Sequence, residues 1–131
     1  MSTIRVDNLK GKTTANTMTV LAGHATDSTT TTNLEQGLAK AWVGSFDFSD
    51  NSVVDSFNAG SFTDNGAGEL ITNFSNNMAN TGYSTTATDN NYSLIMVNAQ
   101  TTSSTRSDTH TTSFNGWDGA IQKVTVHGDL A

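Results

Sequence analysis

The sequence predicts an all-β fold: an antiparallel β-sandwich of about eight strands, jelly-roll-like in arrangement. The chain of 131 residues contains 23 Thr, 14 Ser and 14 Asn and no Pro. Thr fits a pleated strand, whereas Ser and Asn favour turns over helix interiors. Short runs with alternating apolar residues recur at intervals of roughly 8 to 12 residues, which is typical of a sandwich.

The chain has the length of one domain, but its apolar content is small. Only 34% of its residues are hydrophobic, a low fraction that raises the question of disorder. Apolar residues nevertheless cluster in strand-length runs between 40 and 128. The modest core indicates self-association, because further copies can cover surface that one copy cannot bury.

Residues 1–32 are expected to form an extended N-terminal arm. Two strand-like pieces, TIRVDNL and MTVLAG, hold too few apolar residues for a core of their own. A disordered tail is one interpretation; we favour an arm laid against another surface, because a linker needs no apolar residues. The expected anchoring residues are the apolar side chains Ile4, Val6, Leu9, Met18, Val20 and Leu21.

Residues 33–43, NLEQGLAKAWV, are the segment most like a helix. Leu34, Leu38 and Trp42 recur at every fourth position, which places them on one helical face. So short a helix needs a partner for that face, and three copies around an axis would supply one. We therefore expect a collar at 33–43 with these three residues in a trimer interface.

The same segment allows an alternative. Gly37 can end the helix, and Lys40 to Val43 can already belong to the first strand. In either case residues 44–131 are expected to form the β-sandwich domain. The strands that we predict there and at its entry are 40–47, 53–58, 60–63, 68–75, 82–88, 92–99, 109–114 and 120–127. Turns are expected at Asp64-Asn65-Gly66, Asn115-Gly116 and Asp118-Gly119, where the residue types accept positive φ.

Charge and composition exclude several classes of partner. The net charge is −6 with only six Lys and Arg, so no basic patch is available to neutralise phosphates. No apolar run approaches the roughly 18 residues that span a bilayer, and the N-terminal residues contain no apolar export signal. Nucleic acid and membranes are therefore not expected partners.

The motifs of catalytic and metal sites are missing from the sequence. There is no Gly-x-Ser-x-Gly elbow, no Cys, and no pair of His residues at zinc-binding spacing among His24, His110 and His127. The turn DFSDNSVVD could hold Ca²⁺ through its aspartates, but it lacks the Gly and Glu of an EF-hand, and a solvated acidic loop is preferred. We expect neither enzymatic activity nor a cofactor.

One group of polar and aromatic residues suggests a binding surface. Trp117 lies in FNGWDG, at the tip of a Gly-flanked turn, where it could contact a sugar or a neighbouring subunit or be buried under a loop. The candidate residues for binding a glycan or a protein are those of two turns: Asp89, Asn90, Asn91, Asn115, Trp117 and Asp118.

Three stretches carry a resemblance to a known family. They are the opening STIRVDNLKGKTTAN, the junction TTTTNLEQGLAKAWV, and DSFNAGSFTDNGAGELITNFSNNMANTGYS, which together span residues 1–84. Their order resembles that of small virion proteins of marine tailed phages, described as fibre or appendage proteins. From Thr85 on, the likeness is confined to the strand-rich character.

The resemblance implies a β-sandwich, usually trimeric, that the N-terminal segment attaches to the phage particle, and it implies no catalytic residues. The expected partners are further copies of the chain and the major capsid protein or another virion protein. A receptor-binding tail fibre would commonly sit on a longer shaft. The short chain therefore favours a capsid decoration or head fibre on the outer surface of the virion over a tail fibre.

Overall fold

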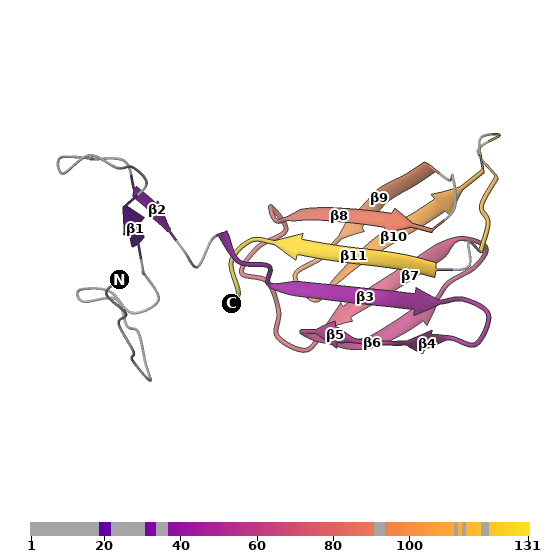
Figure 1. Ribbon diagram of the computed structural model, residues 1–131, viewed down its shortest axis with the longest axis horizontal. Coiled ribbons are helices and arrows are strands. Elements are labelled where there is room, and N and C mark those ends of the chain that lie inside the picture. Colours follow the sequence, from indigo (N-terminus) through magenta and orange to yellow (C-terminus); the bar gives the residue numbers. More distant parts are fainter. Residues whose placement is uncertain are drawn as a thin grey trace, which may run out of the picture. The chain divides into compact units, whose positions relative to one another are not determined.

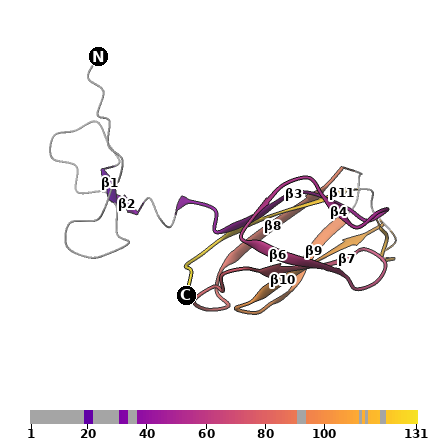
Figure 2. The same ribbon diagram turned by 90° about the horizontal axis from the view of Figure 1, so that it is seen from below.

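The computed structural model of the chain (Figures 1 and 2) describes residues 19–21, 31–33, 37–90, 94–111, 113, 115–118 and 121–131. The chain forms two compact units, Met1–Leu38 and Ala39–Ala131. In the first unit, β1 (Thr19–Leu21) and β2 (Thr31–Asn33) pair antiparallel. The strand expected in MTVLAG is thus present as β1. Ile4, Val6, Leu9 and Met18 lie outside the described residues.

The described part of the second unit contains nine strands. They are β3 (Ala41–Asp47), β4 (Ser52–Val53), β5 (Ser56–Phe57), β6 (Ala59–Asp64), β7 (Glu69–Phe74), β8 (Ser84–Asp89), β9 (Leu94–Gln100), β10 (Ser104–His110) and β11 (Ile121–His127). One antiparallel sheet has the order β6-β7-β10-β9. The other has the order β4-β3-β11-β8, and β5 also pairs with β3. Figure 2 shows the two sheets as two layers.

An apolar core joins the two sheets. Its buried residues come from β3, β7 and β11 and from the segments that follow β3 and β7: Ala41, Val43, Phe46, Phe48, Leu70, Phe74, Met78, Tyr83, Val124 and Val126. The rings of Phe46 in β3 and Phe62 in β6 lie 5.6 Å apart, across the gap between the sheets. In β7 every second residue is buried, as period-two alternation requires. The predicted all-β fold with two antiparallel sheets, like a β-sandwich, is confirmed.

Most predicted strands are present. A strand overlaps each of the segments 40–47, 60–63, 68–75, 82–88, 92–99 and 120–127. The segment 53–58 is broken into the two-residue strands β4 and β5. The predicted strand 109–114 overlaps β10 only at Thr109 and His110, where β10 ends, so its bounds are wrong. The sequence of β10, STRSDTH, has no apolar residue, so hydrophobic alternation could not reveal where this strand begins.

The expected collar helix over 33–43 is wrong at its C-terminal end. Ala41–Asp47 is strand β3, and the Lys40 N–H donates to the Val126 carbonyl at 2.8 Å, which extends its pairing with β11. The alternative, in which Lys40 to Val43 belongs to the first strand, is confirmed for Ala41 to Val43. The second compact unit, Ala39–Ala131, thus includes the first residues of β3.

The sheets contain both hairpins and pairs of strands that are distant in the sequence, such as β7 with β10. Here β6 and β7, and likewise β9 and β10, are hairpins whose strands are neighbours within one sheet. The first and last strands of the unit, β3 and β11, lie side by side.

The chain passes from one sheet to the other at Asn58, between β5 and β6. Its φ of 54° is in the left-handed region, which Asn tolerates better than most residues. The Asn58 amide donates to the Lys40 and Asn76 carbonyls, both at 3.0 Å, and accepts from the Asn76 N–H at 2.6 Å. One side chain thereby ties the corner to the start of β3 and to the turn after β7.

Candidate functional site

The second unit has two unlike ends. Because neighbouring strands are antiparallel, the β3–β4, β6–β7, β8–β9 and β10–β11 connections meet at one end, which we call the loop end (Figure 1). The start of β3 and the C-terminal residues lie at the other end, where Leu130 bridges Met78 and the Ala131 N–H donates to the Asn77 carbonyl. Any surface of this unit that faces away from the start of β3 and from the C-terminal residues is therefore made by the loop end.

At the loop end, the β10–β11 connection is docked on the β6–β7 turn. The Gly68 N–H donates to Asp118 Oδ1 at 2.5 Å, and the Trp117 N–H donates to the Thr109 carbonyl at 3.1 Å. Gly68 has φ 79°, and a Cβ there would collide with the Thr109 carbonyl oxygen and lie 2.8 Å from Trp117 N. Asp118 thus has a structural role, while Trp117 keeps 40% of its surface exposed.

The β6–β7 turn itself forms as the sequence predicted. Gly66 has φ 134°, and its N–H donates to Asp64 Oδ1 at 3.2 Å. The Asn65 amide donates to Glu69 Oε2 at 2.8 Å, which closes the hairpin. In the neighbouring connection, Asn115 is exposed.

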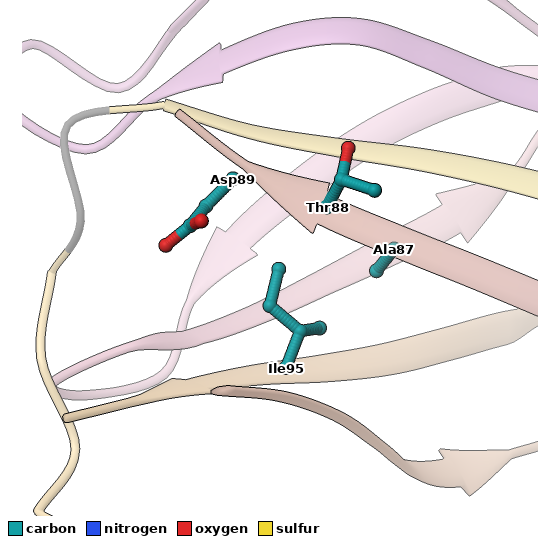
Figure 3. A pocket seen from close by; sticks show the side chains of 4 residues that line it. All are labelled: Ala87, Thr88, Asp89 and Ile95. Atoms are coloured by element: carbon teal, nitrogen blue, oxygen red, sulfur yellow. The ribbon is translucent and has the colours of Figure 1, made fainter. Parts of the chain in front are cut away.

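A cavity of about 320 Å³ opens between β8 and β9. Ala87, Thr88 and Asp89 of β8 and Ile95 of β9 line it, and the side chains of Asp89 and Ile95 point into the gap (Figure 3). A specific ligand pocket brings several polar groups together. This cavity has one carboxylate and one hydroxyl among methyl groups, so its lining does not indicate a particular ligand.

Part of the interior between the sheets is polar. Gln122 is fully buried; its Oε1 accepts from Ser107 Oγ at 2.7 Å, and its Nε2 donates to Thr109 Oγ1 at 2.6 Å. The Ser107 proton is thus held by an amide oxygen, which cannot act as a general base. These three side chains satisfy one another, as buried polar groups must, and they stabilise the packing of the two sheets.

A charged cluster lies on the outer face of the four-stranded sheet. Arg106 Nε donates to Asp108 Oδ1 and Arg106 Nη2 to Glu69 Oε1, both at 2.7 Å, and the Asn98 amide donates to Asp108. The hydrogen bond to Asp108 raises the pKa of Arg106 above its usual value, partial burial opposes this, and the charges of Asp108 and Glu69 add to the rise. Asp108 is only 2% exposed, so Arg106 neutralises a buried carboxylate.

The aspartates of the predicted acidic turn each bond to their own local backbone. Asp47 Oδ1 accepts from the Ser49 hydroxyl and N–H, which lowers the pKa of Asp47. Asp50 accepts from the Ser52 N–H at 3.0 Å, and Asp55 from the Ser56 N–H at 2.8 Å. Among the residues that the structure describes, no three His, Cys, Asp or Glu side chains are placed to hold a metal ion together.

Of the residues predicted for a trimer interface, Leu38 and Trp42 do not share a helical face. Leu38 is 55% exposed in the first unit, whereas Trp42 is partly buried in β3, opposite Phe57 of β5. Leu34 and Asn91 lie outside the described residues. Asp89 points into the cavity and the Asn90 N–H donates to the Ile121 carbonyl. Of the predicted receptor residues, Asn115, Trp117 and Asp118 are exposed on the β10–β11 connection, and Asp118 accepts a hydrogen bond from the Gly68 N–H.

Sequence reasoning missed four features. Asn58, Gln122 and Asp108 were not singled out, because their importance comes from partners distant in the sequence. Strand β9 was predicted, but its position at a sheet edge was not. The signal that could have drawn attention to it is its sequence, LIMVNAQ, which has no charged residue.

The comparisons with known proteins add no relatives. No protein-family model matches the chain, and neither a curated protein nor a solved structure matches it. Within the described residues, no helix has the length and apolar character needed to cross a membrane.

Proposed function

We propose that the chain is a structural protein of a tailed-phage particle: a trimeric capsid decoration or head-fibre protein, docked through residues 1–32 on the major capsid protein or another virion protein. The observation that carries the proposal is that the two ends of the sandwich unit differ. Its first strand begins, and its C-terminus lies, at the end opposite the loop end (Figure 1). A module anchored by its N-terminal segment then presents the loop end outwards, on the outer surface of the virion.

Two further observations support this proposal. The resemblance to phage fibre and appendage proteins covers residues 1–84, which include the N-terminal unit and the first five strands of the sandwich. The polar side chains inside the sandwich, such as Gln122, Ser107 and Thr109, bond to one another and offer no activated nucleophile. A persistent structural module needs such groups for stability rather than for reaction.

The anchoring is tested by adding back the purified full-length chain to particles that lack it. Changing Val20→Asp and Leu21→Asp in the arm should abolish binding, because a docking surface cannot accept two buried charges. The control Thr63→Asp, on an exposed position of β6, should bind like the wild type. Binding by the arm variant at wild-type levels would refute docking through the arm. A monomer in light scattering would refute the trimer.

The second candidate function is a tail-fibre tip that recognises a host surface glycan or protein. Trp117 favours it, because this large aromatic side chain is 40% exposed at the loop end, and Trp is enriched at the centres of binding surfaces. Antibody labelling of intact particles separates the two functions: label on the capsid supports the decoration protein, and label confined to the tail supports the tip. In the second case, Trp117→Ala should reduce adsorption to host cells without changing particle assembly.

A further inference from the structure

Among the strands that the structure describes, the two sheets of the sandwich unit end in four edges. The strand orders place β6 and β9 at the edges of one sheet, and β8 and β4, with β5, at the edges of the other. An edge strand presents backbone N–H and C=O groups that have no partner in its own sheet. Such an edge is a template for pairing with another strand unless charges, Pro, bulges or short length protect it.

Three of these edges carry such protection. Strands β4 and β5 have two residues each. Strand β6 contains Gly60 and ends in Asp64, and its pairing with β7 is irregular near Gly60. Strand β8 is rich in Thr and ends in Asp89. Strand β9 differs, because its seven residues, LIMVNAQ, include no Gly, Pro or charged side chain.

The unprotected part of β9 is its first half, Leu94 to Val97. The register with β10 shifts after Val97, which is a bulge that bends the edge. Beyond it, the Gln100 amide donates to the Tyr83 carbonyl at 3.0 Å and to Thr85 Oγ1 at 3.1 Å, and so covers the strand end. In the first half, Leu94 and Met96 are 43% and 39% exposed on the outer face of the sheet.

We propose that this edge, Leu94 to Val97, pairs antiparallel with the same edge of a second copy of the chain. Each chain has a net charge of −6, so copies repel, and contact is most favourable where no charge lies on the strand. A two-fold axis makes one patch complementary to itself. With Met96 facing Met96 of the second copy, Ile95 faces Val97, and apolar side chains meet at these positions.

The pairing joins the two four-stranded sheets into one and covers Leu94 and Met96. It does not depend on the proposed trimer. Two trimers joined in this way contain six copies, whereas without the trimer the assembly contains two. An even number of copies is expected in both cases.

The test measures the mass of the full-length protein by light scattering. The wild-type assembly should contain an even number of copies. The assembly of the Met96→Lys variant should have half the wild-type mass, because a lysine on an exposed edge strand opposes pairing with another strand. The matched control Thr63→Lys places the same charge on an exposed position of β6, at the opposite edge of the same sheet, and should keep the wild-type mass. If Met96→Lys fails to fold by circular dichroism, Leu94→Lys takes its place.

The absence of Cys from the chain allows a direct check of the register. Met96→Cys places two thiols opposite each other across the two-fold axis, at a separation that a disulfide can span. Mild oxidation should therefore link Met96→Cys chains in pairs and leave Thr63→Cys chains unlinked.

A wild-type mass of one or three copies would overturn the inference, and three copies would at the same time support the trimer. An unchanged mass for the folded lysine variants would overturn it as well. A mass of two copies that the variant halves would support the pairing and refute the trimer.

Discussion

The corner at Asn58 provides the sharpest test of how this fold is held together. Replacing Asn58 by Ala removes the three side-chain hydrogen bonds to Lys40 and Asn76. It also places a residue with no polar side chain at φ 54°. The change leaves the apolar core intact, so its effect reports on the corner alone.

The magnitude follows from these two contributions. Hydrogen bonds contribute about 0.5 to 1.5 kcal/mol each, and water reaches two of the three, so together they contribute about 2 to 3 kcal/mol. The left-handed backbone costs an alanine roughly 1 to 2 kcal/mol. Asn58→Ala should thus lower the free energy of unfolding by about 4 kcal/mol, a large part of the roughly 5 to 15 kcal/mol of a typical domain.

A matched control separates the two contributions. Asn51 has φ 55° in the exposed turn between β3 and β4, and no hydrogen bond of its side chain supports the fold there. Asn51→Ala should therefore cost only the backbone contribution, roughly 1 to 2 kcal/mol. Urea titrations of both variants measure the two changes, provided that the dependence on urea concentration stays the same. If Asn58→Ala costs no more than Asn51→Ala, the hydrogen bonds do not stabilise the corner and the reasoning fails.

Three further predictions concern the interior and the loop end. Gly68→Ala should lower the melting temperature markedly, since the strained φ and the collision with Thr109 together cost about 3 kcal/mol; an unchanged melting temperature would contradict the docking of the β10–β11 connection. Gln122→Leu should destabilise by about 2 kcal/mol in urea titrations, because the buried hydroxyls of Ser107 and Thr109 lose their partner. Adding Ser107→Ala and Thr109→Val should restore part of that loss, and no recovery would argue against the network. Burial raises the pKa of Tyr83 above its usual 10.0, although hydrogen bonds with Thr105 and Thr101 oppose the rise. Burial of the neutral Tyr83 hydroxyl therefore contributes fully to the free energy of unfolding below pH 10.0, and this contribution is lost as the pH rises through the folded-state pKa. Unfolding curves at alkaline pH should show this loss in the wild type and a smaller loss in Tyr83→Phe.

The elements that could be predicted well from the sequence are those whose pattern lies within a few neighbouring residues. Strand β7 shows alternation of Leu70, Thr72 and Phe74 with outward residues, and these three are buried. The turn at Asp64-Asn65-Gly66 follows from residue types that accept positive φ. Both features depend on a few neighbouring residues, so the printed sequence suffices to find them.

Elements whose partners are distant could not be found in the same way. Leu34, Leu38 and Trp42 recur at every fourth position, which suggested a helix. The pairing of β3 with β11 nevertheless places Trp42 in a strand, because tertiary contacts often override local propensity. The side chains of β10 that point into the sandwich are all Thr or Ser, so they give no apolar signal. This segment is a strand because it pairs with β7 on one side and with β9 on the other. The order of strands in a sheet, and with it the exposed edge of β9, is likewise a property of the whole fold.

The polar interior has a thermodynamic consequence. Thr72, Thr105, Ser107, Thr109 and Gln122 are almost fully buried between the sheets, so unfolding exposes more amide and hydroxyl surface than in a domain with an aliphatic core. Newly exposed polar surface lowers the heat capacity of unfolding, whereas apolar surface raises it. Calorimetry should give a value per residue below the usual range of about 12 to 15 cal/mol/K. In such a domain the free energy of unfolding varies little with temperature, so its folded population changes little between cold and warm water.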